Sequence, residues 1–277
     1  MAPNPPVQKS VVITGGASGI GLAMAEHFAS AGHRVAILDL RGVDVAADLA
    51  TRHAGSGGTV TFRQCDVTSW KEQSAAFADV FREHGGKIDV VMANAGISEG
   101  GVTSAVDLRE EEPSEPRLGV VNVNLIGVIY TVKLAAHYMN KGGQRGAASR
   151  GTIVCTASNA GLYPFPTAPL YAATKAGVIA LVRSLAPHLA PVAIQINALA
   201  PAVLETNIAP NKDLFKNMRI TPMSTLIRGV AQFVDDPKRT GEVAEIHGNH
   251  VTTRHPHDII DEDSAYNLRT FWGLGYA

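Results

Sequence analysis

The chain has 277 residues, a formal net charge of −1 at pH 7 and 45% hydrophobic residues. This length buries a large core without metal ions or disulfides, and the small charge gives no electrostatic basis for binding nucleic acid. The start, MAPNPPVQKS, has no apolar signal-peptide core, and no run approaches the roughly eighteen apolar residues of a membrane span. We therefore expect a cytoplasmic protein that contacts neither membrane nor nucleic acid, with Cys65 and Cys155 as buried thiols.

The first predicted unit is a strand, a glycine-rich turn and a helix. Residues 11–13 form a short apolar strand, TGGASGIG follows over residues 14–21, and residues 22–32 have the pattern of an amphipathic helix. Glycines let the backbone approach a pyrophosphate, and a helix N-terminus supplies oriented N–H groups. The spacing G-x-x-x-G-x-G from Gly15 to Gly21 therefore predicts a nucleotide-binding loop, with an ordinary strand-to-helix turn as the alternative.

The second predicted strand ends at Asp39. An acidic side chain at this position suits the adenosine ribose hydroxyl groups and repels a 2′-phosphate, which favours NAD over NADP. Arg41 argues the other way, because an arginine can bind a 2′-phosphate, whereas Ala17 and Ser18 in the glycine loop are not basic. The alternative for Asp39 is a solvated carboxylate at a strand end.

Strands and helices then alternate along the chain. The expected elements are helix 43–53, strand 60–65, helix 69–84, strand 88–93, helix 117–140, strand 152–156, helix 171–190, strand 192–199, helix 223–235 and strand 242–248. This order predicts an α/β fold, a doubly wound parallel sheet (Rossmann fold) of about seven strands with helices on both faces. Ligands of such sheets bind at the carboxyl ends of the strands, so residues 14–21, Asp39, Asp66 and residues 94–96 should share one rim.

We expect one domain over residues 1–277, with a core at about 9–250, a substrate lid at 202–230 and a C-terminal extension at 249–277. The lid region is rich in Ile, Leu, Met and Phe, which suggests an apolar substrate. The aromatic residues of the extension could pack on a partner subunit or close over the site. His255-Pro256-His257 has no third ligand at a defined spacing and predicts a loop rather than a metal site.

Ser158, Tyr171 and Lys175 are the candidate catalytic side chains. Tyr171 and Lys175 share one face of a predicted helix, and an ammonium group beside a phenol lowers its pKa. A tyrosine tuned in this way can act as a general acid or base near neutral pH. Ser158, at the end of the preceding strand, could donate a hydrogen bond to the substrate oxygen. Asn124, inside an apolar helix, is either a satisfied core amide or a functional kink that holds water.

Taken together, these motifs resemble the short-chain dehydrogenase/reductase family over about residues 9–250. The resemblance rests on the order of the glycine loop, Asp39, residues 94–96, Asn124, Ser158, Tyr171 and Lys175. The stretch GLYPFPTAPLYAATKAG is also similar to the 15-hydroxyprostaglandin dehydrogenase branch, and the last strand and tail are similar to fungal secondary-metabolism members.

The resemblance implies a role for each matching residue. Tyr171 would be the acid or base, Ser158 would orient the substrate oxygen, and Asn124 would hold a water of a proton relay. Lys175 would hold the nicotinamide ribose and lower the Tyr171 pKa. The implied cofactor-binding residues are Gly15, Ser18, Gly19, Ile20, Gly21, Asp39, Leu40, Asp66, Val67, Asn94, Ala95, Gly96, Tyr171, Lys175, Pro201, Leu204 and Thr206.

The sequence departs from the family pattern at three places. Ala93 stands where the family has asparagine, and Ala202 stands where it has glycine, which would add strain if that backbone needs a positive φ. The last strand leads into His247-Gly248-Asn249 instead of Asp-Gly-Gly, a strand end that often helps to build tetramers. The helices of Asn124 and Tyr171 usually form the dimer interface, so we expect a homodimer or homotetramer.

The sequence thus predicts an NAD-dependent oxidoreductase that interconverts a secondary alcohol and a ketone by hydride transfer. Its small-molecule substrate would be apolar, polycyclic or lipid-like. One alternative is an NADPH-dependent ketone reductase of a biosynthetic pathway. Another is a non-catalytic nucleotide-sensing protein on the same fold, although such proteins often lose the tyrosine or lysine that this chain keeps.

Overall fold

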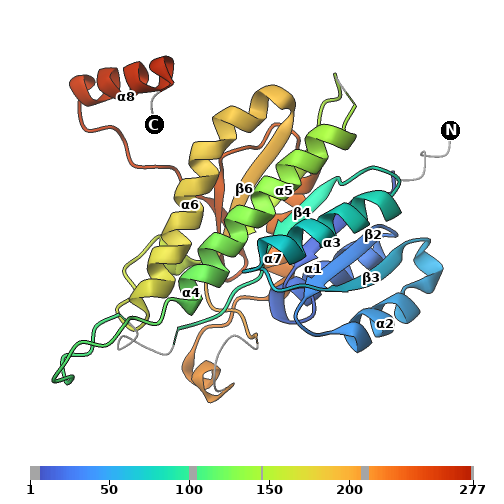
Figure 1. Cartoon of the computed structure of the whole chain (residues 1–277), viewed down its shortest axis with the longest axis horizontal. Helices are drawn as coiled ribbons and strands as arrows, with labels where there is room; N and C mark the ends of the chain where they lie inside the picture. Colours follow the sequence, from blue (N-terminus) through green and yellow to red (C-terminus); the bar gives the residue numbers. More distant parts are fainter. Residues whose placement is uncertain (1–6, 100–104, 145, 207–211, 276–277) are drawn as a thin grey trace.

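An eight-stranded sheet forms the centre of the protein, as the computed structural model shows (Figure 1). The structure describes residues 7–99, 105–144, 146–206 and 212–275. The strands are β1 (Ser10–Thr14), β2 (Arg34–Asp39), β3 (Thr59–Gln64), β4 (Val90–Ala93), β5 (Gly151–Thr156), β6 (Ile194–Pro201), β7 (Val243–His247) and β8 (His250–Thr253). The longer helices are α1 (Gly19–Ser30), α2 (Val43–Arg52), α3 (Trp70–Glu83), α5 (Gly127–Gly142), α6 (Pro169–Leu189), α7 (Met223–Asp235) and α8 (Glu262–Leu274).

The strand order, β3-β2-β1-β4-β5-β6-β7-β8, confirms the predicted doubly wound sheet. From β1 to β7 every pair of neighbours is parallel. The chain runs outward from β1 to β3, returns to β4 beside β1, and then runs outward in the other direction. The carboxyl ends of these strands therefore share one edge, with the change of direction between β1 and β4, where ligands of open α/β sheets bind.

The prediction of about seven strands was one strand short. The additional strand, β8, pairs antiparallel with β7, with His247 opposite His250. Gly248, at φ 48°, lies in the two-residue turn between the strands. Glycine adopts this left-handed conformation without the steric cost that a side chain brings. The dipeptide Gly248-Asn249 between two short strand-like runs is a hairpin signal that the sequence reading passed over.

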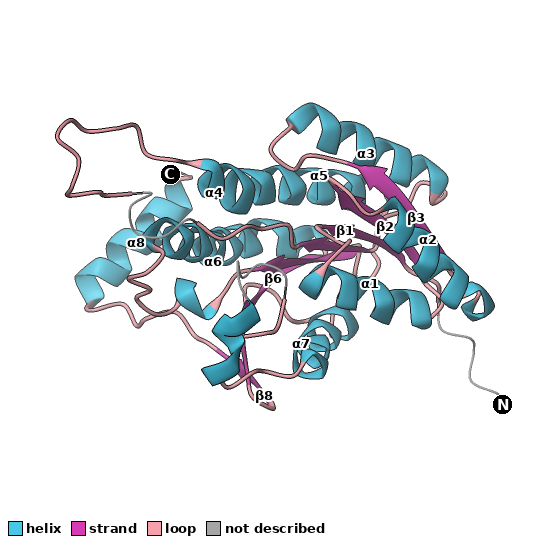
Figure 2. Cartoon of the chain, turned by 90° about the horizontal axis from the view of Figure 1, so that it is seen from below, coloured by secondary structure: helices cyan, strands magenta, loops and turns pink. Residues whose placement is uncertain are grey.

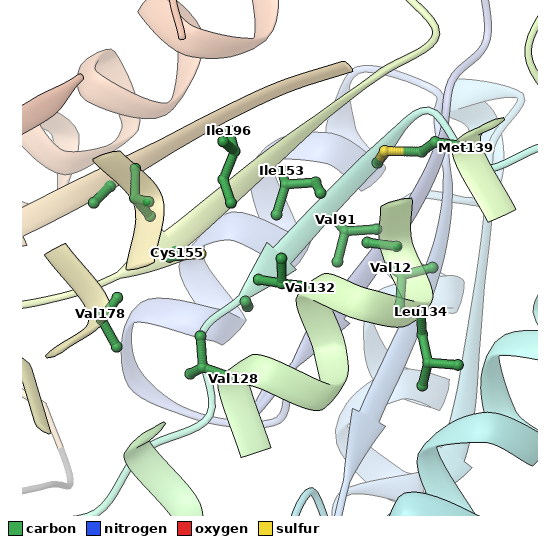
Figure 3. Close-up of a cluster of buried hydrophobic side chains, with 14 of the residues drawn as sticks. Val12, Val91, Val128, Val132, Leu134, Met139, Ile153, Cys155, Val178 and Ile196 are labelled. Atoms are coloured by element: carbon green, nitrogen blue, oxygen red, sulfur yellow. The ribbon is translucent and has the colours of Figure 1, made fainter. Parts of the chain in front are cut away.

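The sheet is covered on both faces by helices (Figure 2). One face packs against α3, α5 and α6, and the other packs against α1, α2 and α7. Because successive side chains of a strand point to opposite faces, Val12 enters the first core and Val11 and Ile13 enter the second. In the first core, side chains of α5 and α6 lie against the central strands (Figure 3). The continuous apolar runs of the sequence are thus explained by burial on both sides.

The long apolar helix predicted at 117–140 is interrupted. It starts as α4 (Gly119–Val121), continues as a π-helical turn, η3 (Asn122–Ile126), and then as α5. By length and composition the stretch 119–142 is apolar enough to cross a membrane, and 44% of its most apolar window is buried in the protein. Its inner side chains pack against the sheet, as those of a core helix do.

The C-terminal extension contains a helix that the sequence reading did not predict. α8 projects away from the sheet at the end of an extended segment (Figure 1). Ala265 is its one buried residue, while Phe271 and Trp272 are 56% and 69% exposed. These two aromatic residues neither pack on the body nor close over the rim in this chain. Tyr276 lies outside the described residues.

Candidate active site

The glycine loop joins β1 to α1 at the carboxyl edge of the sheet. Gly15 and Gly19 have φ values of 65° and 51°, which favour glycine. A Cβ on Gly21 would lie 2.0 Å from the Gly15 carbonyl oxygen, so this position has no room for a side chain. Ser18 is the exposed residue before α1, and the first N–H groups of a helix have no partner within it. The loop thus presents a helix N-terminus with close backbone access, as a pyrophosphate requires.

Asn94 ties the ends of three neighbouring strands together. Its Nδ2 donates to the carbonyl oxygens of Thr14 and Gly15, both at 3.2 Å. Its Oδ1 accepts from the Thr156 hydroxyl at 3.0 Å, and the Ala95 N–H donates to Thr14 Oγ1 at 3.3 Å. The Asn94 amide therefore holds the glycine loop in place, and Thr156, which completes this network, was not among the predicted residues.

Asp39 lies beside the glycine loop at the end of β2. Its Oδ2 accepts a hydrogen bond from the Ala17 N–H at 3.1 Å, and the next side chain, Leu40, is 57% exposed. Asp66 lies at the same edge, where its Oδ1 accepts from the N–H and the hydroxyl of Thr68, both at 2.8 Å. The predicted rim is therefore present, with one oxygen of the Asp39 carboxylate already bonded to the loop.

Val67 and the segment after β6 frame the same edge. Val67 is buried, and a Cβ on Gly127 would lie 3.0 Å from it. A Cβ on Gly19 would lie 3.2 Å from Thr206 Cβ, so the segment after β6 reaches the glycine loop. Pro201 ends β6 and Leu204 is buried in the core under that segment. Ile20 of α1 packs against the same core.

Ala202 does not have the positive φ that would strain the backbone at an alanine. Among the described residues Ala193 is the non-glycine residue with a positive φ, at 57°. The Ala202 N–H donates to the Ile246 carbonyl at 2.8 Å, which continues the sheet ladder past the end of β6. Alanine is therefore accommodated there without a left-handed backbone.

Ser158 and Tyr171 meet at the carboxyl end of β5. Ser158 is buried and caps the short helix η4 (Asn159–Gly161), where its Oγ accepts from the Ala160 N–H at 3.2 Å. Tyr171 lies in the first turn of α6, half-buried. Burial raises the pKa of the Tyr171 phenol, and a hydrogen bond with the Ser158 side chain acts in the opposite direction. The phenol is therefore protonated at neutral pH.

Lys175 is buried one helical turn further along α6. Its Nζ donates to the Thr156 carbonyl at 2.8 Å and lies 5.5 Å from the centroid of the Tyr171 ring. Burial lowers the pKa of Lys175 to about 8. Lys175 does not lower the Tyr171 pKa as the sequence predicts. The pKa is raised, because desolvation of the phenol outweighs the other influences and the ammonium group is held at the Thr156 carbonyl.

Asn124 is fully buried within the π-helical turn η3. Its Oδ1 accepts from the Ile97 N–H and its Nδ2 donates to the Ile97 carbonyl, both at 2.9 Å. A Cβ on Gly96 would lie 3.3 Å from Asn124 Oδ1 and 3.6 Å from Lys175 Nζ, so the three residues are neighbours. The side chain is satisfied by protein backbone, as in a core amide, while π-helical turns of this kind are frequent at functional sites.

Glu99 is a functional candidate that the sequence reading missed. Its Oε2 accepts a hydrogen bond from the backbone N–H of Tyr171, which joins the segment after β4 to the first turn of α6. No short motif or periodicity links two residues so far apart, and the contact follows only from the fold.

The two cysteines are buried and free, and burial raises the pKa of each thiol to about 12, so neither is a nucleophile.

The residues of this edge fit a nicotinamide dinucleotide. The glycine loop leaves space at a helix N-terminus, Asp39 stands at the strand end where an adenosine ribose would be recognised, and Lys175 lies beside the phenol. Among the described residues no cluster of histidine, cysteine or carboxylate side chains is arranged to hold a metal ion.

Fold and site together define a dinucleotide-dependent oxidoreductase. Residues 9–217 match the short chain dehydrogenase family. The short-chain dehydrogenase/reductase prx4 of Penicillium roqueforti is 36% identical over 271 residues, covering 96% of this chain and 74% of its own. The cis-2,3-dihydrobiphenyl-2,3-diol dehydrogenase of Paraburkholderia xenovorans is 33% identical over 246 residues, covering 88% of this chain and 82% of its own.

A solved structure shows the same fold. The NADPH-dependent 3-quinuclidinone reductase of Rhodotorula rubra superposes with a TM-score of 0.73 at 27% identity, covering 87% of this chain and 90% of its own. The chain belongs to the short-chain dehydrogenase/reductase family, with Penicillium short-chain dehydrogenases/reductases among its relatives. It is an NAD(P)-dependent oxidoreductase acting on CH–OH groups, as predicted.

Proposed function

We propose that this protein is an NAD-dependent dehydrogenase that interconverts a secondary alcohol and a ketone on an apolar small molecule. The observation that carries the proposal is the placement of Ser158, Tyr171 and Lys175 together at the sheet edge that also holds the glycine loop. A proton-handling phenol and a nucleotide-binding loop on one edge are what carbonyl–alcohol chemistry needs.

Each catalytic side chain has a distinct role in this proposal. The bound nicotinamide supplies or takes the hydride. Tyr171 gives its phenol proton to the substrate oxygen during reduction and takes one from the hydroxyl during oxidation. Ser158 donates to the same oxygen, while Lys175 holds the ribose and supplies positive charge. Because burial raises the Tyr171 pKa, the protonated phenol is ready for reduction at neutral pH, and oxidation should be faster at higher pH.

The proposed cofactor is NAD, and Asp39 supports it. Its carboxylate is positioned by the Ala17 N–H, next to where the adenosine ribose would lie. A fixed negative charge there disfavours the 2′-phosphate of NADP. The alternative is an NADPH-dependent ketone reductase. It is supported by the likeness to the NADPH-dependent 3-quinuclidinone reductase. It is also supported by the likeness to the structure of ElxO with NADP bound, which superposes with a TM-score of 0.72 at 27% identity.

Asp39→Asn tests the cofactor proposal. The amide keeps an oxygen for the Ala17 N–H but removes the charge, so the preference for NAD over NADP should fall about tenfold or more. Fluorescence titration of both reduced cofactors against wild type and variant measures this. Tighter NADPH binding by the wild type, or an unchanged ratio in the variant, would contradict the role of Asp39.

The proposed substrate is apolar because an aromatic ring lies near the phenol and further apolar side chains, including those of the predicted lid region, are exposed. The Phe165 ring is 6.4 Å from the Tyr171 ring, centroid to centroid. Tyr163 and Phe165 are 45% and 44% exposed, and Met218 and Ile220 of the lid region are also exposed. Apolar side chains left open near a reacting group are typical of a site for an apolar ligand.

We further propose a homodimer or homotetramer in the cytoplasm. Family members are commonly oligomeric. The outer surface of α6 presents the small exposed residues Ala173, Ala176 and Ala180, and neighbouring α5 exposes Ile129. A second subunit could approach such a surface closely. Light scattering on the eluting protein would give the number of subunits, and a monomer would contradict this part of the proposal.

A further inference from the structure

Glu99 has a carboxylate oxygen that the mechanism does not use. Oε2 accepts from the Tyr171 N–H, whereas Oε1 is buried and has no hydrogen-bond partner among the residues that the structure describes. A buried carboxylate oxygen without a donor is costly, and such groups in native proteins call for an explanation. A donor carried by the substrate would supply the missing hydrogen bond.

The position of Glu99 is set by well-anchored neighbours. Ile97 is held through both its N–H and its carbonyl by Asn124, and Gly96 lies against Lys175 Nζ. The chain from β4 therefore passes the catalytic lysine before it reaches the first turn of α6. Glu99 lies next to Tyr171 in the first turn of α6. The Tyr171 ring lies near the Phe165 ring.

We propose that Glu99 is a specificity-determining residue that accepts, at Oε1, a hydrogen bond from a second hydroxyl group on the substrate. This inference rests on the proposed function and narrows its substrate class to diols and hydroxyketones. Lys175 already places a positive charge at this end of α6, which favours a neutral hydroxyl over an ammonium group as the donor. A site built to bind a hydroxyl group discriminates strongly against an analogue that lacks it.

Two variants separate recognition from positioning. Glu99→Gln keeps an oxygen for the Tyr171 N–H and puts an NH2 group, a donor, where the unpaired acceptor stands. Glu99→Ala removes both functions. Glu112→Gln, in the exposed acidic loop, is the matched control for loss of one carboxylate. Thermal unfolding shows whether each variant is folded.

The assay measures kcat/KM with NAD for cyclohexanol and for 1,2-, 1,3- and 1,4-cyclohexanediol, within a wider panel of secondary alcohols and ketones. We expect the best diol to exceed cyclohexanol about tenfold or more in the wild type. Glu99→Gln should lose more rate with the diol than with cyclohexanol, so that the advantage of the diol disappears, Glu99→Ala should lose rate with both, and Glu112→Gln should match the wild type.

Two results would overturn the inference while leaving the proposed function intact. One is a wild type that oxidises cyclohexanol as well as every diol. The other is an equal loss with diol and mono-alcohol in Glu99→Gln, which would show that Glu99 only holds Tyr171. If the wild type turned over no alcohol or ketone at all, the proposed function itself would fail, and this inference with it.

Discussion

At the scale of single residues, the site depends on two opposed shifts of pKa. Burial raises the pKa of the Tyr171 phenol and lowers that of the Lys175 ammonium group to about 8. Both shifts favour the uncharged form, as desolvation requires. Ser158 is the side chain that counteracts the shift at Tyr171, because its hydrogen bond lowers the phenol pKa. Ser158, rather than Lys175, is therefore the side chain that lowers the pKa of the proposed proton-transfer group.

Ser158→Ala should move the pH profile of alcohol oxidation. Without the hydrogen bond, the Tyr171 pKa rises further, so the acidic limb of kcat/KM against pH should shift to higher pH. The rate at neutral pH should fall about a hundredfold. Ser184→Ala, on the exposed side of α6, is the control. An unshifted limb would show that Ser158 does not tune the phenol.

Residue-level prediction succeeded where a side chain belongs to a local motif. Tyr171 and Lys175 share a helix, and Asp39 follows its strand directly, so spacing alone places them on the edge of the sheet. Glu99 had no such signal, since it reaches Tyr171 through the path of a loop. The balance of burial against charge at Tyr171 also depends on packing, which spacing does not report.

At the scale of elements, α6 carries both the phenol and a buried ammonium group. Lys175 is 3% exposed, and its Nζ donates to the Thr156 carbonyl of β5. A charge held in this way lowers stability for the sake of function. The lysine is uncharged in the folded protein above about pH 8 but charged in the unfolded chain up to its usual pKa of 10.5.

Comparison with Lys175→Met should show how much the buried charge of Lys175 lowers the free energy of unfolding, because that effect depends on pH. Between pH 8 and 10.5 the unfolded wild type binds more protons than the folded one, so its free energy of unfolding rises with pH. Relative to Lys175→Met, the wild type should gain about 2 kcal/mol from pH 7 to pH 9.5. Urea unfolding of both proteins at the two pH values measures the difference. If the difference in free energy of unfolding between the two proteins did not change with pH, the pKa of Lys175 would not be lowered in the folded protein.

Element boundaries were predictable where the hydrophobic period was regular. The strands and most helices follow apolar runs closely, because both faces of the sheet are buried. The π-helical turn at Asn122–Ile126 and the hairpin strand β8 were missed for different reasons. The π-helical turn keeps the apolar pattern of the helix and changes only its backbone hydrogen bonds. The strand β8 is indicated only by the turn dipeptide Gly248-Asn249.

At the scale of the whole molecule, the reversal of strand direction brings distant segments to one edge. The glycine loop, Asp39, Asn94, Thr156 and Thr206 come from five different segments, yet hydrogen bonds and close contacts join them. Among the described residues of the extension beyond β8, those of α8 take no part in this edge. α8 buries only Ala265 within the described chain.

Removal of residues 256–277 should therefore leave the fold intact. With so little of α8 buried, the melting temperature should change by less than about 2 °C. Differential scanning calorimetry of the shortened and full-length proteins measures this, and light scattering compares their subunit number. A fall of more than about 5 °C would contradict the peripheral position of α8.

The most direct test of the account is the turnover of Tyr171→Phe. This variant removes the phenol oxygen and keeps the ring, which lies 6.4 Å from Phe165 between centroids. We predict that kcat/KM for alcohol oxidation falls at least about a hundredfold, while NAD binding measured by fluorescence titration stays within about twofold. A variant that keeps wild-type turnover would contradict the assignment of Tyr171 as the group that moves the proton.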